Sequence, residues 1–143
     1  AITSNAGWDT IKHAEHLTNL VNTFKKENIR VSIFVDPLTH MVEGAKNVGA
    51  DRVELYTEPY AEQFLKNKEQ AIADYLIAAK KAEELGLGVN AGHDLDLNNL
   101  NYIHIQIPNL LEVSIGHALV CDALYYGLEN TINLYRRALN SFE

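Results

Sequence analysis

Residues 88–93, GVNAGH, and residues 113–117, VSIGH, are the two stretches around which this sequence is organised. Each is a short run with β-branched residues that stops at a Gly-His pair, and a helical pattern follows each run. A glycine just past a strand lets the backbone turn tightly and approach a ligand closely. The amides that open the next helix then face that ligand with the positive end of the helix dipole. The two stretches therefore predict an anion site at two consecutive strand ends, where an α/β barrel usually binds phosphate.

The rest of the chain alternates helical and strand patterns, beginning with a helix. Strands are expected near residues 30–36, 52–57, 88–91 and 111–115. A first helix is expected from Asp9 or Thr10 to about residue 28, and a second at 38–48 that ends at Gly49. The region 60–85 is expected to be helical in two pieces and to end at Gly86. A further helix is expected from an N-cap at Asp96 to Pro108, and a final pair of helices is separated at Gly127. Such alternation predicts parallel strands joined by right-handed crossovers.

Four such strands fit either a small doubly wound sheet or half of an eight-stranded barrel. The opening helix has no strand before it, and this favours the half-barrel. We therefore expect an α/β fold, the last four β/α units of a (β/α)8 TIM barrel, with residues 1–143 as a single-domain fragment.

Strand side chains alternate between the two faces of the sheet, and one face is apolar. The other face carries Asp36, Glu54, Asn90 and Glu112. Because a buried carboxylate is costly unless it is paired, each needs a partner or a task. For Glu54 we favour a catalytic or ligand role over a structural ion pair. Asp36 is open between turn-capping and function, and Glu112, far from the catalytic rim, is expected to be structural.

Composition excludes several functions. The net charge is -7 and no basic stripe exists, which argues against nucleic-acid binding. No apolar run approaches the ~20 residues of a membrane span. The single cysteine, Cys121, has apolar neighbours and is expected in the core, and a cytoplasmic location is expected. His13 and His16 are three residues apart, but no third ligand is near, so a metal is not expected there.

His93 and His117 stand just past strand ends, where barrel enzymes place their chemistry. Imidazole titrates near neutral pH and is therefore suited to proton transfer. His40 and His104 fall in helical patterns without such a context and are expected to be surface or packing residues.

The segments VNAGH at 89–93, SIGHA at 114–118, VSIFVD at 31–36 and VELYT at 53–57 resemble the pyridoxine 5′-phosphate synthase family. Their order and spacing are similar to the C-terminal half of that family's barrel, over essentially the whole chain. The resemblance implies an enzyme that condenses 1-deoxy-D-xylulose 5-phosphate with 3-amino-2-oxopropyl phosphate to pyridoxine 5′-phosphate, phosphate and water. It also implies a homo-octamer that needs no metal or organic cofactor.

By the same resemblance, His93 is the proton donor and Glu54 a carboxylate that stabilises the transition state. Asp94 contacts the aminoketone phosphate, and Gly116 and His117 hold that phosphate. The family more often has His-Thr-Gly at 56–58 and Gly at 94. A carboxylate near a phosphate is unfavourable, so a backbone contact is expected at Asp94.

The other bases of the family belong to the N-terminal half, which this chain lacks, so the fragment alone is predicted to be inactive. Two alternatives stay open. One is another phosphosugar lyase or isomerase on the same barrel, and the other is a non-enzymatic flavodoxin-like domain that binds an anion.

Overall fold

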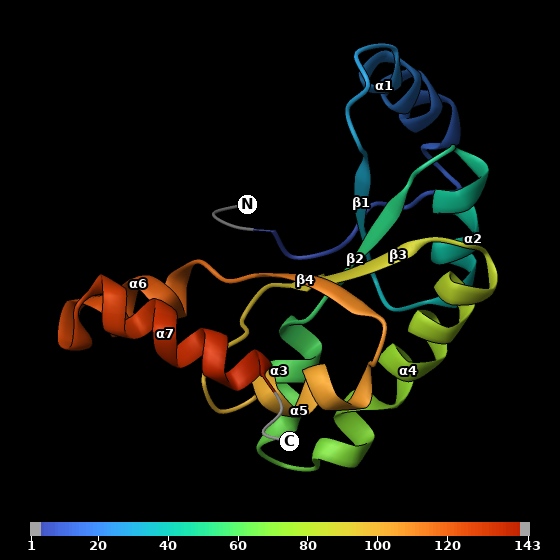
Figure 1. Ribbon diagram of the computed structural model, residues 1–143. Coiled ribbons are helices and arrows are strands. Elements are labelled where there is room, and N and C mark those ends of the chain that lie inside the picture. The colour runs from blue at the N-terminus through green and yellow to red at the C-terminus, as the bar shows by residue number, and fades with distance from the viewer. Residues whose placement is uncertain (1–3, 141–143) are drawn as a thin grey trace.

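The computed structural model describes residues 4–140 as one four-stranded sheet with flanking helices (Figure 1). The ends of the predicted 1–143 domain, residues 1–3 and 141–143, lie outside the described residues. The elements in chain order are α1 (Ala14–Lys26), β1 (Ser32–Val35), α2 (Thr39–Asn47), β2 (Arg52–Tyr56), α3 (Glu58–Phe64), α4 (Lys68–Glu84), β3 (Gly88–Gly92), α5 (Leu100–Gln106), β4 (Leu110–Ser114), α6 (His117–Tyr126) and α7 (Leu128–Leu139). The predicted alternation of strands and helices is confirmed.

All strand pairs are parallel, and the strands are neighbours in chain order, β1-β2-β3-β4. A doubly wound sheet reverses its strand order at a switch point, whereas a barrel adds each strand to the same side of the last. The sequential order therefore matches four β/α units of a (β/α)8 barrel, as expected, and differs from the flavodoxin-like alternative.

The register places the polar residues of the sheet in one row. Glu54 in β2 is opposite Phe34 in β1 and Asn90 in β3, and Asn90 is in turn opposite Glu112 in β4. In β1, β2 and β3 the neighbouring positions on the other face are buried and apolar, with Val53, Leu55 and Val89 fully buried, whereas Val113 of β4 is only partly buried. The predicted separation into an apolar and a polar face is confirmed.

Helices α2, α4 and α5 lie against the apolar face and complete the core (Figure 1). Their buried side chains include Val42 of α2, Ala78 and Ala82 of α4, and Ile103 of α5. The polar row lies on the opposite face, which these helices do not cover. The packing therefore leaves one side of the sheet accessible to a ligand.

Most helix ends match the sequence prediction. Gly49, Gly86 and Gly127 have φ values of +90°, +68° and +78°, a left-handed conformation that glycine adopts without the Cβ penalty. Asp96 differs from its prediction: α5 begins only at Leu100, and the Asp96 carboxylate accepts N–H bonds from Asn98 and Asn99. Asp96 therefore stabilises the turn before the helix rather than capping the helix itself.

Cys121 is a second correction, because the structure places it on the surface rather than in the core. It lies on α6, and none of the ten residues of this helix is buried by the described part of the chain. Helices α6 and α7 extend beyond the β4 edge of the sheet, away from α2 and α4 (Figure 1). Apolar neighbours in the sequence indicated a core position, but α7 packs on another side of α6 and leaves the side that carries Cys121 exposed.

None of the helices in residues 4–140 is long and apolar enough to cross a membrane.

Candidate functional site

The carboxyl ends of the strands border one open cleft of about 1230 Å³. The five residues singled out from the sequence all line it: Glu54, His93, Asp94, Gly116 and His117. Parallel strands end at the same edge of a sheet, so residues just past β3 and β4 meet there although they are distant in sequence. The cleft also has residues of the segment before α1 in its lining, Trp8 and His13 among them, which the sequence did not indicate.

Glu54 is half-buried in the middle of β2, and its carboxylate occupies space that Gly92 of β3 leaves open. A Cβ at position 92 would collide with Oε1 of Glu54 and would also press on Cβ of Ser114. Among the residues that the structure describes, Glu54 has no hydrogen bond or ion pair. A partly buried carboxylate without a cation nearby is an unfavourable arrangement unless a ligand interacts with it.

Glu112, at the other end of the polar row, has the partners that Glu54 lacks. Arg30 and Arg52 each approach its Oε1 to 2.9 Å, and the Asn90 amide donates to Oε2 at 3.1 Å. Desolvation raises the pKa of this carboxyl, but the hydrogen bond and charge of Arg30, helped by Arg52, outweigh it and lower the pKa overall. The predicted structural role of Glu112 is confirmed.

The backbone at the end of β3 is fixed by β2. The Thr57 N–H donates to the carbonyl of Gly92 at 2.9 Å, and the Thr57 hydroxyl donates to the carbonyl of His93. The edge of the Tyr56 ring packs on the His93 imidazole with 5.1 Å between ring centroids. These contacts hold His93, whose side chain is only 17% exposed, at the wall of the cleft.

The turn after β3 differs from the one expected. Gly92 stays in the strand, and the left-handed residues are His93 and Asp94, with φ values of +90° and +55°. Such a conformation costs a non-glycine residue on the order of 1–3 kcal/mol. Asn99 stabilises it by donating to the Asp94 carbonyl at 3.1 Å. A glycine at 94, which the resemblance indicated as more usual, would adopt this backbone without that cost.

The two Gly-His turns lead into different structures. After His93, residues 94–99 precede α5, so this helix begins at Leu100, later than the Asp96 cap predicted. After Gly116 the helix starts at once: Gly116 is the N-cap residue and His117 opens the ten-residue α6. Gly116, His117 and Ala118 all line the cleft. The first amides of a helix have no partner within it, so this end of α6 is suited to an anion.

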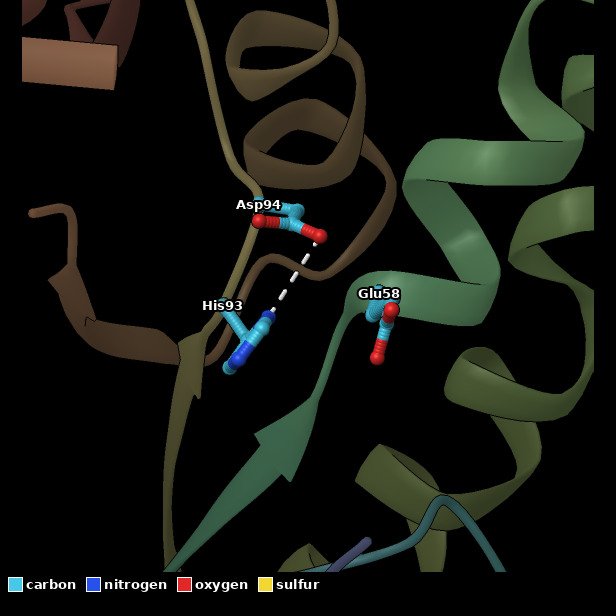
Figure 2. Close-up of side chains that lie close together, drawn as sticks. All are labelled: Glu58, His93 and Asp94. Carbon is cyan, nitrogen blue, oxygen red and sulfur yellow. Dashed lines mark ion pairs between the residues drawn. The ribbon is translucent and has the colours of Figure 1, made fainter. Parts of the chain in front are cut away.

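Glu58, at the start of α3, was named in the sequence only as a departure from the family pattern, and it lies beside the site. One ligand atom each of Glu58, His93 and Asp94 lies within 4.8 Å of the others, and Nδ1 of His93 is 3.5 Å from Oδ2 of Asp94 (Figure 2). An imidazole and two carboxylates are able to ligate a divalent cation. Glu58 is the second residue after the end of β2, and this position near a strand end was the available signal in the sequence.

Asp36 takes a structural part at the same rim. Its Oδ1 accepts the backbone N–H of Gly7 at 3.0 Å and so ties the segment before α1 to the end of β1. This contact joins two segments that are 29 residues apart, which is a structural role other than the turn-capping considered from the sequence.

The chain is similar to proteins of one family. The family model described as pyridoxal phosphate biosynthesis protein PdxJ matches residues 1–141. The pyridoxine 5′-phosphate synthase of Cytophaga hutchinsonii is 70% identical over 139 residues, which are 97% of this chain and 58% of that protein. The synthase of Phocaeicola vulgatus is 57% identical over 98% of this chain and 59% of its own length. The synthase of Flavobacterium johnsoniae is 55% identical over 97% of this chain and 59% of its own length. The chain thus spans less than two thirds of these relatives.

Proposed function

The chain belongs to the PdxJ family of pyridoxal phosphate biosynthesis proteins, and on that premise we propose that it forms the C-terminal half of a pyridoxine 5′-phosphate synthase. The proposed reaction condenses 1-deoxy-D-xylulose 5-phosphate with 3-amino-2-oxopropyl phosphate and releases phosphate and water. The observation that carries the proposal is the convergence of Glu54, His93 and the Gly116–His117 turn on one cleft.

His93 is the proposed proton donor. Joining an amine to a ketone and then losing water requires repeated proton transfer, which a positioned imidazole performs well near neutral pH. The contacts from Thr57 and Tyr56 support this role, because they hold the backbone and ring of His93 at the cleft wall. A fixed donor lowers the cost of bringing the proton and the reacting atom together.

Glu54 is the proposed stabilising carboxylate. Positive charge develops on nitrogen when an amine adds to a carbonyl and an iminium forms, and a nearby carboxylate stabilises that charge. The position of Glu54 in the cleft, with Glu112 neutralised by arginines instead, supports this division of roles. The charge of Glu54 is thereby available to the substrate.

The proposed phosphate site is the start of α6 at Gly116 and His117. The open space around Gly116, where a Cβ would meet no atom within 4 Å, lets an oxyanion approach the backbone. We place Asp94 at the same site through its backbone only. Its side chain is 48% exposed and negatively charged, so it would repel a phosphate. Phosphorylated substrates are thus bound by amides although the net charge is -7.

The proposal includes partners. Within the described residues β1 and β4 each pair with one neighbouring strand only, so each has one edge with no strand beside it. We propose that the remaining part of the barrel, which the greater length of the relatives accommodates, pairs with these edges and supplies the other bases. Homo-oligomers, with an octamer as the specific expectation, are proposed on the resemblance alone.

The test is an assay of the full-length protein for pyridoxine 5′-phosphate from the two phosphorylated substrates, with His93→Ala and the control His40→Ala. His40 is exposed on α2 and does not line the cleft. We expect the His93 variant to lose at least ~100-fold in kcat, the usual size of an acid–base contribution, and the control to retain full activity. An unchanged rate in the His93 variant would remove this residue from the mechanism. Turnover of other phosphosugars without this product would favour the lyase or isomerase alternative.

A further inference from the structure

The segment before α1 forms a second wall of the cleft, and Trp8 is its largest residue. The Trp8 N–H donates to the carbonyl of Phe34 in β1 at 2.8 Å, and the Gly7 N–H donates to Asp36. A side chain at position 7 would collide with the backbone of residues 35 and 36, so only glycine permits this close approach. The backbone that carries Trp8 is therefore fixed against the carboxyl end of β1.

The indole ring of Trp8 also contacts two imidazole rings. The His13 ring meets it edge-on with centroids 5.7 Å apart, and the His16 ring is tilted against it at 6.1 Å. These are the two histidines whose spacing suggested a pair in the sequence, and their common contact is the indole. Trp8 nonetheless remains 44% exposed and lines the cleft together with Glu54, His93 and His117.

We propose that Trp8 is the surface against which the pyridine ring of pyridoxine 5′-phosphate packs while its phosphate is bound at Gly116 and His117. The proposal rests on the function proposed above and adds a residue that determines affinity for the ring. A flat heteroaromatic ring packs favourably on an indole, and a protonated ring nitrogen adds attraction to the negative face of the indole. An anion site alone would retain inorganic phosphate as readily as the phosphate ester, whereas Trp8 distinguishes the two.

The experiment measures binding of pyridoxine 5′-phosphate and of inorganic phosphate to the full-length protein by titration calorimetry. The variants are Trp8→Leu, which keeps an apolar side chain without an aromatic face, and Trp8→Phe, which keeps a ring. Tyr125→Ala on α6 is the control, because Tyr125 is 86% exposed and outside the cleft. We expect Trp8→Leu to weaken pyridoxine 5′-phosphate binding about 10-fold, Trp8→Phe to weaken it less, and phosphate binding to stay unchanged in both.

Other outcomes have separate meanings. Unchanged binding of pyridoxine 5′-phosphate by Trp8→Leu overturns the role of Trp8. An equal loss for both ligands also overturns it, because Trp8 would then act on the phosphate site or on folding rather than on the ring. Failure of the unsubstituted protein to bind pyridoxine 5′-phosphate at all contradicts the proposed function itself. Weaker binding in the Tyr125 control would show that the effect is not specific to the cleft and would overturn the proposal.

Discussion

The carboxylate of Glu54 lies over the backbone of Gly92, in the space that a side chain at position 92 would fill. The two residues belong to neighbouring strands, β2 and β3, and both point toward the polar face of the sheet. Gly92 is therefore required for the room it leaves rather than for its backbone conformation.

Gly92→Ala is accordingly expected to displace Glu54 and to lower kcat by at least ~10-fold, since a misplaced charge at a reacting centre is costly. Gly86→Ala is the control: nothing lies near its Cβ, so only its positive φ is strained. The control should lose on the order of 1 kcal/mol of stability and keep its kcat. Steady-state kinetics and urea unfolding measure both. Equal kcat values in the two variants would contradict the packing of Glu54 on Gly92.

Replacing Tyr75 or Tyr56 by phenylalanine should have different effects on the free energy of unfolding, because only one of the two buried hydroxyls is hydrogen-bonded. The Tyr75 hydroxyl donates to the carbonyl of Tyr56 at 2.7 Å and accepts the N–H of Tyr60 at 3.3 Å. The Tyr56 hydroxyl is buried and has no hydrogen-bond partner among residues 4–140. Tyr75→Phe should therefore cost ~1–3 kcal/mol of unfolding free energy, whereas Tyr56→Phe should leave stability unchanged or raise it by up to ~1 kcal/mol. Urea unfolding at neutral pH tests the pair, and a large loss in Tyr56→Phe would contradict the assignment.

The carboxylate of Asp51 should contribute to the loss of folding stability at low pH. Its carboxylate accepts the Val31 N–H at 2.9 Å and pairs with Lys25 at 2.9 Å. The Val31 hydrogen bond chiefly, and Lys25 in addition, hold its pKa below the ordinary value of 3.8. Protonation then costs more in the folded state, so the stabilisation is present above about pH 3.8 and disappears as the pH falls through the lower folded-state pKa.

The variant Asp51→Asn should lose no more than ~1 kcal/mol near neutral pH, because both partners are partly exposed and solvent screens the pair. The difference from the unsubstituted protein should shrink below about pH 3.8. Urea unfolding at a series of pH values measures this. A difference that stays constant into the acid range would show that the charge of Asp51 is not responsible.

Metal removal tests the cluster of Glu58, His93 and Asp94. The proposed reaction needs proton transfer and charge stabilisation, which His93 and Glu54 supply without a cation. We therefore expect dialysis against EDTA to leave turnover unchanged. The turnover of the variant Glu58→Gln should likewise not change when Mn²⁺ or Zn²⁺ is added. Loss of activity in EDTA that Mn²⁺ or Zn²⁺ restores would instead make the cluster a metal site.

The sequence alone was sufficient for the features that depend on local order. The two-residue period of strand side chains predicted which residues share a face, and so the polar row of Glu54, Asn90 and Glu112. Gly-His pairs at strand ends predicted a shared rim, because parallel strands all end on the same edge of the sheet. These predictions needed only periodicity and chain direction.

Tertiary structure decided what depends on contacts between distant segments. Gly92 makes room for Glu54 only because the register of β2 and β3 places them together, and the left-handed turn falls on His93 and Asp94 because Thr57 and Asn99 hold that backbone. Cys121 is exposed because α7 packs on another side of α6 and no element of the described chain covers the position of Cys121. Residue types and spacing determine the strands and helices, whereas which atoms meet across them is set by register and packing.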